Sequence, residues 1–285
     1  MRKSVICAAL LLLFPVLSTA CSDSDWKTHP ILCETLERLE ENEAQVVNEL
    51  HELARASGWI VEFPETELTS TLRRQRRGLQ QSSSQLPVVV AHGMGDSCFN
   101  QGISSITQQI GSWLNVYSVC IPTGATQTED TKNGYFLSMD ANVDIFANAI
   151  FNNPQLSRGF HAIGFSQGNN VIRGYITKYN TPYVHTFLSI NGVNAGISAL
   201  PHCTANSKWC AMLNELASER AYTAFAQEHS FQANYWRDPF KYDEYLKFSQ
   251  LAVYNNEVSP MNATFNANWS KTQQFVWIKA DDDTM

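Results

Sequence analysis

The pentapeptide GFSQG at residues 164–168 has the form G-x-S-x-G, in which a serine can act as the nucleophile of acyl transfer. Chance produces this pattern in about one chain in ten of this length, so the flanking sequence decides its meaning. An apolar strand pattern precedes Ser166, and a helical pattern follows it at residues 169–179. This order predicts a tight strand–turn–helix that exposes Ser166 and directs the peptide N–H of Gln167 at a reacting carbonyl.

A glycine-rich stretch, HGMGD at residues 92–96, can supply a second donor to such a carbonyl. It follows the apolar run at residues 88–91, and its glycines let peptide N–H groups turn inward. The N–H of Met94 is the candidate partner of the Gln167 N–H in an oxyanion hole. We interpret His92 as a hydrogen-bonded structural side chain, because it precedes the serine and lies within the oxyanion loop itself.

Apolar runs alternate with amphipathic patterns from Leu86 onward. Strands that alternate with helices predict an α/β fold with a mainly parallel sheet that is covered on both faces. The stretch at about residues 201–260 is rich in helix formers and aromatic residues, which predicts a helical insert. The expected strands are residues 86–92, 115–122, 160–166, 183–192 and 273–280, and the expected helices are residues 105–114, 143–153 and 169–179.

The composition restricts the kinds of partner. The chain has 285 residues, of which 44% are hydrophobic and 16% are charged, as is ordinary for a globular protein. Its net charge of -7 argues against nucleic acid as the main partner. Neither an HExxH nor a CxxC motif nor a glycine-rich phosphate loop occurs, so we expect no metal and no other cofactor.

The N-terminus has the features of a secretory signal peptide at residues 1–20. Two basic residues precede an apolar run at residues 5–17, which is too short to span a bilayer, and small residues end at Ala20. No later run approaches the apolar length of a membrane-spanning helix, so we expect no transmembrane segment. We expect the mature protein to be lysosomal or secreted.

Residues 21–77 form a helical, acidic segment in which residues 31–57 carry an amphipathic pattern. The basic sequence R-x-R-R ends at Arg77, and a polar linker follows at residues 78–85. A processing protease that cuts after Arg77 would make residues 21–77 a propeptide. An uncut, solvated linker explains the same residues equally well.

A secretory compartment permits disulfides and N-glycosylation. Cys203 and Cys210 flank a short polar loop and form the best single pair, although six cysteines allow 15 pairings. The sequons at Asn262 and Asn268 lie close together in a polar stretch, so we expect both to be exposed and glycosylated. The cysteines left after cleavage are residues 21, 33, 98, 120, 203 and 210.

Several stretches resemble, in order and spacing, the palmitoyl-protein thioesterases of the lysosomal type. They are VVVAHGMGDSCFNQG, YFLSMDANV, FHAIGFSQGNNVIR, ALPHC and QANYWRDPFKYDEYL. The resemblance covers residues 86–285 and implies an α/β-hydrolase fold with a helical, aromatic-rich insert. It also implies that the substrates are S-acylated proteins, whose long-chain fatty acyl thioesters are hydrolysed during lysosomal breakdown.

The resemblance implies a role for each site residue. Ser166 matches the nucleophile, Met94 and Gln167 match the oxyanion hole, and Asp283 matches the acid of the catalytic triad. The pair Cys203–Cys210 resembles a disulfide of the family. Cys98 matches one of two adjacent family cysteines, but Phe99 replaces the other, so a Cys98–Cys120 pair is an alternative.

The family order Ser…Asp…His places the catalytic histidine well downstream of Asp283, whereas this sequence ends at Met285. His185, His202 and His229 all precede Asp283, so the resemblance assigns the role to none of them. We therefore expect the natural chain to continue through the C-terminal end of the fold. Two alternatives remain, namely an acyl-binding protein that lost the base and a general lipase or esterase on the same fold.

The insert is where an acyl chain would bind. Eleven of the residues at 201–260 are aromatic, and some of them would line a groove while the others pack the insert onto the sheet. Each buried methylene contributes about 0.8 kcal/mol, so a long groove selects long acyl chains.

Overall fold

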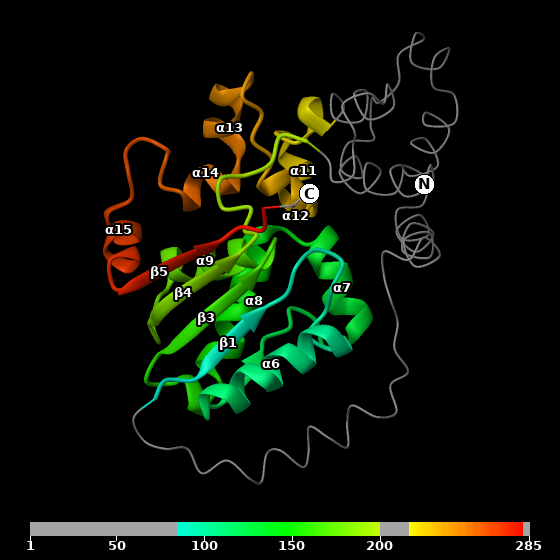
Figure 1. Cartoon of the computed structure of the whole chain (residues 1–285). Coiled ribbons are helices and arrows are strands. Elements are labelled where there is room, and N and C mark those ends of the chain that lie inside the picture. Colours follow the sequence, from blue (N-terminus) through cyan, green and yellow to red (C-terminus); the bar gives the residue numbers. More distant parts are fainter. Residues whose placement is uncertain (1–84, 200–216, 282–285) are drawn as a thin grey trace.

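The five expected strands form one parallel sheet in the order β2-β1-β3-β4-β5 (Figure 1). The computed structural model describes residues 85–199 and 217–281. The α/β prediction and the parallel arrangement are confirmed. The strands are β1 (Val88–Ala91), β2 (Ser118–Cys120), β3 (Phe160–Phe165), β4 (Val184–Ile190) and β5 (Gln274–Ile278).

The strand order contains a topological switch point between β1 and β3. The chain passes from β1 to β2 on one side, and then returns to add β3 on the other side of β1. Loops that leave β1 and β3 therefore diverge and open a crevice at the carboxyl ends of these strands, where α/β sheets bind ligands. Both sequence motifs, residues 92–96 and 164–168, lie at this position.

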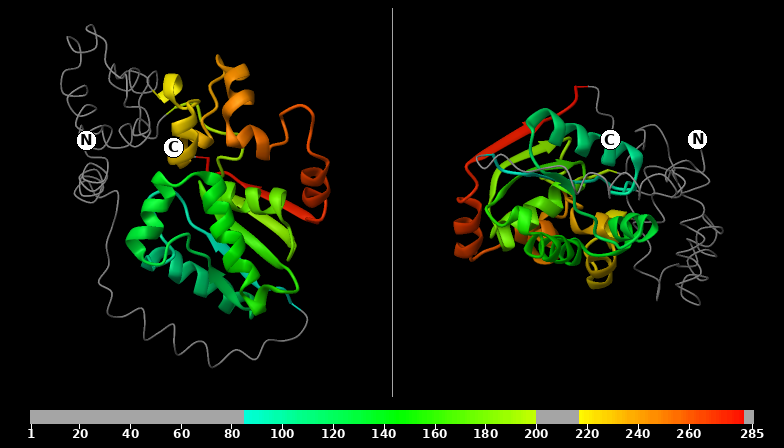
Figure 2. Two further views of the ribbon diagram at one scale, coloured as in Figure 1. Left: turned by 180° about the vertical axis from the view of Figure 1, so that it is seen from behind. Right: turned by 90° about the horizontal axis from the view of Figure 1, so that it is seen from below.

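Helices cover the two faces of the sheet unequally (Figure 2). On one face, α6 (Gln101–Leu114) packs Ile103 against Val88 and Val90. The other face carries α8 (Met139–Phe151) and α9 (Gly168–Lys178) and the larger apolar cluster. These three helices overlap the expected ones, and α8 and α9 end one or two residues before the predicted ends.

Helix α7 (Gln127–Phe136) was not predicted. Its sequence, QTEDTKNGYF, is polar and carries no apolar stripe, yet Asp130, Thr131 and Gly134 are buried. Thr126 caps its first turn by accepting a hydrogen bond from the N–H of Glu129. Tyr135 is its only buried apolar side chain, so the helix is held largely by polar contacts, which hydrophobic periodicity does not reveal.

The expected helical insert is confirmed over its described part, residues 217–260. Figure 1 places α11 and α12 over the edge at which the strands end. A parallel bridge between Ile197 and Trp236 ties the insert to the segment after β4. The remaining elements are the short helix η1 (Pro154–Leu156), α11 (Ala224–His229), α12 (Phe231–Asn234), α13 (Tyr242–Phe248), α14 (Gln250–Tyr254) and α15 (Ala263–Trp269).

A disulfide joins Cys98 to Cys120, with their Cα atoms 5.4 Å apart. It links the loop after β1 to the end of β2. The Cys98–Cys120 pair, which the sequence left open as an alternative, is therefore confirmed. Cys203 and Cys210 lie outside the described residues, as do the expected signal peptide, the segment 21–77 and Asp283. Within the described ranges, no helix has both the length and the apolar character needed to cross a membrane.

The expected exposure of the two sequons is right for Asn262 and wrong for Asn268. Asn262 is exposed and caps α15 through its Oδ1, which accepts from the N–H groups of Thr264 and Phe265. Asn268 is 6% exposed, and its Nδ2 donates to the carbonyl of Thr177 at 3.0 Å. A glycan on that nitrogen would have no room at this buried position.

Substitution of the two asparagines separates these environments. Asn262→Gln should remove one glycan and leave the free energy of unfolding within about 0.5–1 kcal/mol, the cost of a weakened cap. Asn268→Gln should leave the glycan pattern unchanged and destabilise the fold by about 1–3 kcal/mol, because it leaves the buried carbonyl of Thr177 without its hydrogen-bond donor. Glycosidase-treated gels and urea denaturation measure both, and a glycan found at Asn268 would contradict this structure of α15.

Candidate active site

Ser166 sits at a strained turn between β3 and α9. Its backbone φ is 47°, in the left-handed region that residues other than glycine seldom adopt. Its N–H donates to the carbonyl of Ile190 at 3.0 Å, and its own carbonyl accepts from the Nδ2 of Asn169 at 2.9 Å. This strand–turn–helix geometry is that of a nucleophile elbow, as the pentapeptide predicts.

Close backbone approach explains the two glycines of the pentapeptide. A Cβ on Gly164 would lie 2.5 Å from the Oδ1 of Asn169, and one on Gly168 would lie 2.4 Å from the carbonyl oxygen of His92. Neither contact is sterically tolerable. The absence of these side chains lets the start of α9 pack directly on the end of β1.

The oxyanion loop, residues 92–96, runs beside Ser166. A Cβ on Gly93 would lie 3.3 Å from the Cβ of Ser166. No hydrogen bond within the described ranges uses the peptide N–H of Met94 or of Gln167. Both groups are therefore available to a ligand, as an oxyanion hole requires.

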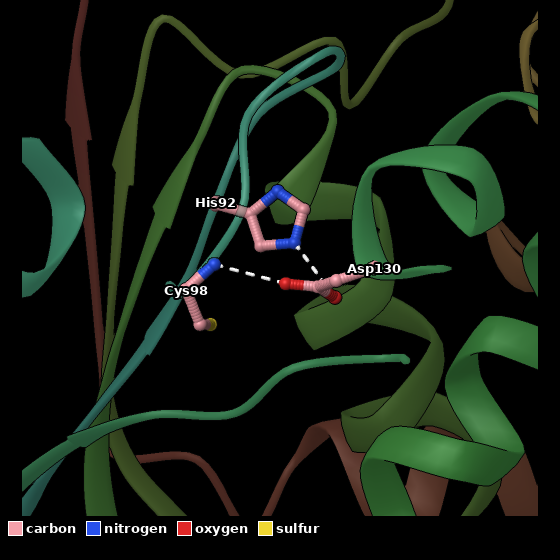
Figure 3. Close-up of side chains that lie close together, drawn as sticks. All are labelled: His92, Cys98 and Asp130. Atoms are coloured by element: carbon pink, nitrogen blue, oxygen red, sulfur yellow. Dashed lines mark hydrogen bonds and ion pairs between the residues drawn. The ribbon is translucent and has the colours of Figure 1, made fainter. Parts of the chain in front are cut away.

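His92 forms a buried pair with Asp130, which projects from α7 (Figure 3). The Nε2 of His92 lies 3.2 Å from Oδ1 of Asp130, and its Nδ1 lies 2.9 Å from the carbonyl oxygen of Gly93. Both partners only accept hydrogen bonds, so the ring satisfies both only when each nitrogen carries a proton. Both ring nitrogens are therefore engaged, and neither is left to take the proton of Ser166.

The pKa values of this pair move in opposite directions. Burial alone would lower the pKa of His92, but the hydrogen bond and charge of Asp130 outweigh burial and raise it. Burial alone would raise the pKa of Asp130, but the same bond, the charge of His92 and backbone donors lower it. The charged pair is the stable form between these two pKa values.

Asp130 also collects donors from two further segments. Its Oδ2 accepts from the hydroxyl of Ser97 at 2.8 Å and from the N–H of Cys98 at 2.9 Å. Its Oδ1 accepts from the N–H of Thr123 at 2.6 Å. The carboxylate thus fixes both ends of the oxyanion loop, and the Cys98–Cys120 disulfide fixes it to β2.

The same three side chains resemble a metal site in composition only. Ligand atoms of His92, Cys98 and Asp130 lie within 4.8 Å of one another. However, the Cys98 sulfur is already bonded to Cys120, and both nitrogens of His92 are engaged in the contacts described above. Because a metal ion needs thiolate and neutral imidazole ligands, these residues do not fit one.

The described histidines do not supply a base to Ser166. No hydrogen bond among the described residues reaches its Oγ. His161 and His185 face each other with ring centroids 5.1 Å apart near the amino ends of β3 and β4, away from the elbow. The side chain of His229 is 43% exposed and lies against Phe225.

A small cavity of about 20 Å³ lies beneath His92 and Gln167, between β1 and the starts of α9 and α12. That volume suits one water molecule and is far too small for an acyl chain. Its walls include Ile121, Phe146 and Phe231.

Comparison with known proteins places this geometry in one family. The family model described as palmitoyl protein thioesterase matches residues 87–285. The chain belongs to this family. It is 32% identical over 207 residues to Palmitoyl-protein thioesterase 1 of Caenorhabditis elegans, a match that covers 72% of this chain and 69% of that protein.

Two further relatives carry the family name. Palmitoyl-protein thioesterase 3 of Dictyostelium discoideum is 31% identical, with 70% of this chain and 66% of that protein covered. A palmitoyl-protein thioesterase-dolichyl pyrophosphate phosphatase fusion of Schizosaccharomyces pombe is 29% identical, with 65% and 30% covered. A lipase of Bacillus licheniformis has a TM-score of 0.40 and 14% identity, covering 68% of this chain and 65% of its own.

The Asp130 pair provides a stability test of the thioesterase fold. Asp130→Asn should lower the free energy of unfolding by about 3–5 kcal/mol, because it leaves the His92 cation buried without its counter-charge. Asp144→Asn is the matched control, since that carboxylate is 48% exposed and pairs with Lys178, so its loss costs at most about 1 kcal/mol. Urea denaturation at pH 6 measures both. Equal losses of unfolding free energy in the two variants would show that the buried His92–Asp130 pair stabilises the fold no more than an exposed ion pair does.

The raised pKa of His92 gives this contact a pH dependence of known sign. Its stabilisation is fully present below the ordinary histidine pKa of 6.5 and is lost as the pH rises through the raised folded-state pKa. His92→Gln should therefore remove a fall in unfolding free energy that the wild type shows at alkaline pH. His229→Gln, at an exposed site, should retain the fall. A wild type with no fall above pH 6.5 would show that His92 is neutral.

Proposed function

We propose that this protein hydrolyses long-chain fatty acyl thioesters, such as palmitoyl groups on protein cysteines, through an acyl-enzyme at Ser166. The observation that carries the proposal is the strained Ser166 with the oxyanion loop against it, in a chain that belongs to the palmitoyl-protein thioesterase family. The names of three relatives support the substrate class.

The chemistry follows from the positions of the donors. Ser166 Oγ attacks the thioester carbonyl, and the N–H groups of Met94 and Gln167 stabilise the negative oxygen of the tetrahedral intermediate. The intermediate expels the cysteine thiolate, and water then hydrolyses the acyl-serine. A thiolate leaves readily, so the base matters most for the protons of Ser166 and of water. Asp283 and a histidine further downstream complete the proposed triad.

The insert supports the proposed acyl groove only in part. Phe231 and Trp236 are each 1% exposed and pack the insert, while Phe225 and Phe248 are 40% and 43% exposed. Of the aromatic residues in the described part of the insert, the exposed ones are those that an acyl chain can contact.

A lysosomal or other secretory location belongs to the same proposal. The signal peptide at residues 1–20, processing at Arg77 and the sequon at Asn262 all agree with it. The proposed partners are S-acylated proteins and peptides.

Removal of the nucleophile tests the proposal directly. In the protein expressed from its complete gene, Ser166→Ala should lower palmitoyl-thioester hydrolysis by about 10⁴–10⁶-fold, because no acyl-enzyme can form. Ser112→Ala, at an exposed position on α6, should retain the wild-type rate. Release of free thiol from a palmitoyl thioester gives the rate.

Three results would contradict the proposal. A wild-type protein that binds the acyl thioester without turnover would be an acyl-binding protein. Faster hydrolysis of triglyceride than of palmitoyl thioester, with Ser166→Ala as the blank, would indicate a lipase. A genuine stop codon after residue 285 would leave the triad without the downstream histidine that the family order requires.

A further inference from the structure

The side chain of Gln167 is buried and fully bonded. Gln167 is 3% exposed, and its Nε2 donates to the carbonyl of Gly134 at 2.7 Å. Its Oε1 accepts from the Nε2 of Gln232 at 2.8 Å and from the hydroxyl of Tyr235 at 3.0 Å. Gln167, whose peptide N–H is the candidate oxyanion donor, is therefore also held in place by hydrogen bonds of its side chain.

The three partners come from two elements outside the elbow. Gly134 lies in the last turn of α7, where carbonyls lack an N–H partner within the helix. Its oxygen also accepts from the Nε2 of Gln232 at 2.8 Å. Gln232 lies on α12, and Tyr235 follows that helix directly. The insert and α7 thus meet at the side chain of Gln167.

Burial makes this cluster restrictive. Gln232 and Tyr235 are each 3% exposed, so a bond lost here cannot be replaced by one to bulk water. A buried polar group left without a partner destabilises the fold. Gln167 therefore cannot rotate without cost, and its N–H is held together with its side chain.

We propose that Gln232 and Tyr235 are positioning residues, through which the insert holds the Gln167 N–H in place for the oxyanion. This inference rests on the function proposed above. Burial raises the pKa of the Tyr235 hydroxyl, which keeps it protonated and able to donate.

The insert has anchors that do not involve Gln167. Asn234 Oδ1 accepts from the N–H of Met139 at 2.6 Å, and the Ile197–Trp236 bridge fastens the next residues. Loss of one hydroxyl at Tyr235 should therefore leave the insert attached and change the position of the donor alone.

The test is Tyr235→Phe in the full-length protein. It should lower kcat for palmitoyl-thioester hydrolysis by about 10- to 100-fold with KM within about twofold, because a displaced donor stabilises the transition state less. Tyr222→Phe is the matched control in the same insert, since Tyr222 is 4% exposed and its hydroxyl bonds, among the described residues, only the backbone of Trp236 and Asp238. The control should retain the wild-type kcat.

A double-mutant cycle separates positioning from general packing. Gln167→Met removes the side-chain amide and keeps the peptide N–H. In that background, Tyr235→Phe should lower kcat no further. An additive loss would mean that Tyr235 acts without Gln167 and would overturn the inference.

A readout that needs no turnover keeps the two proposals apart. The ¹⁵N amide signal of Gln167 should shift, and its hydrogen exchange should accelerate, in Tyr235→Phe but not in Tyr222→Phe. If the wild type lacks turnover while this contrast holds, the proposed function fails and the positioning role stands. If both variants match the wild type in kcat and in the amide signal, the positioning role is wrong.

Discussion

The carboxylate of Asp130 determines where the oxyanion loop can run. It has no exposed surface, and a buried charge is tolerated only when charge and hydrogen bonds compensate it. That compensation comes from the imidazolium of His92, from Ser97 and Cys98, and from Thr123. Because these donors belong to separate segments, satisfying one carboxylate fixes them relative to each other, and the N–H of Met94 with them.

The topology explains why this anchoring stabilises the candidate site. The switch point between β1 and β3 brings the loop after one strand against the turn after the other. Gly168 then permits the start of α9 to touch the end of β1, so two peptide N–H groups from distant segments share one crevice. The strain at Ser166 is supported from the other side of β3, where its N–H is bonded to the carbonyl of Ile190.

The sequence predicted those features that depend on apolar pattern and local turn chemistry. All five strands and the elbow at Ser166 follow from them. Helix α7 does not, because Tyr135 is its only buried apolar side chain and its importance lies in the buried carboxylate of Asp130, 38 residues beyond His92. Asn268 was misjudged for a related reason, since a polar stretch does not reveal which amide is satisfied by a buried carbonyl. The Cys98–Cys120 disulfide could not be assigned from the sequence, because it depends on how close the loop after β1 comes to the end of β2 in the folded chain.

Two kinds of bonding therefore converge on Ser166, and they respond differently to the surroundings. On the side of Met94 the loop is held by a charged pair, which titrates as the pH leaves the window between the pKa values of Asp130 and His92. On the side of Gln167 the contacts are neutral amides and a protonated phenol, which do not titrate at physiological pH. A rise in pH thus weakens the contacts on the side of Met94 and leaves those on the side of Gln167 unchanged. Both sets of contacts end on α7, through Asp130 and the carbonyl of Gly134, so this helix joins the two halves of the candidate site.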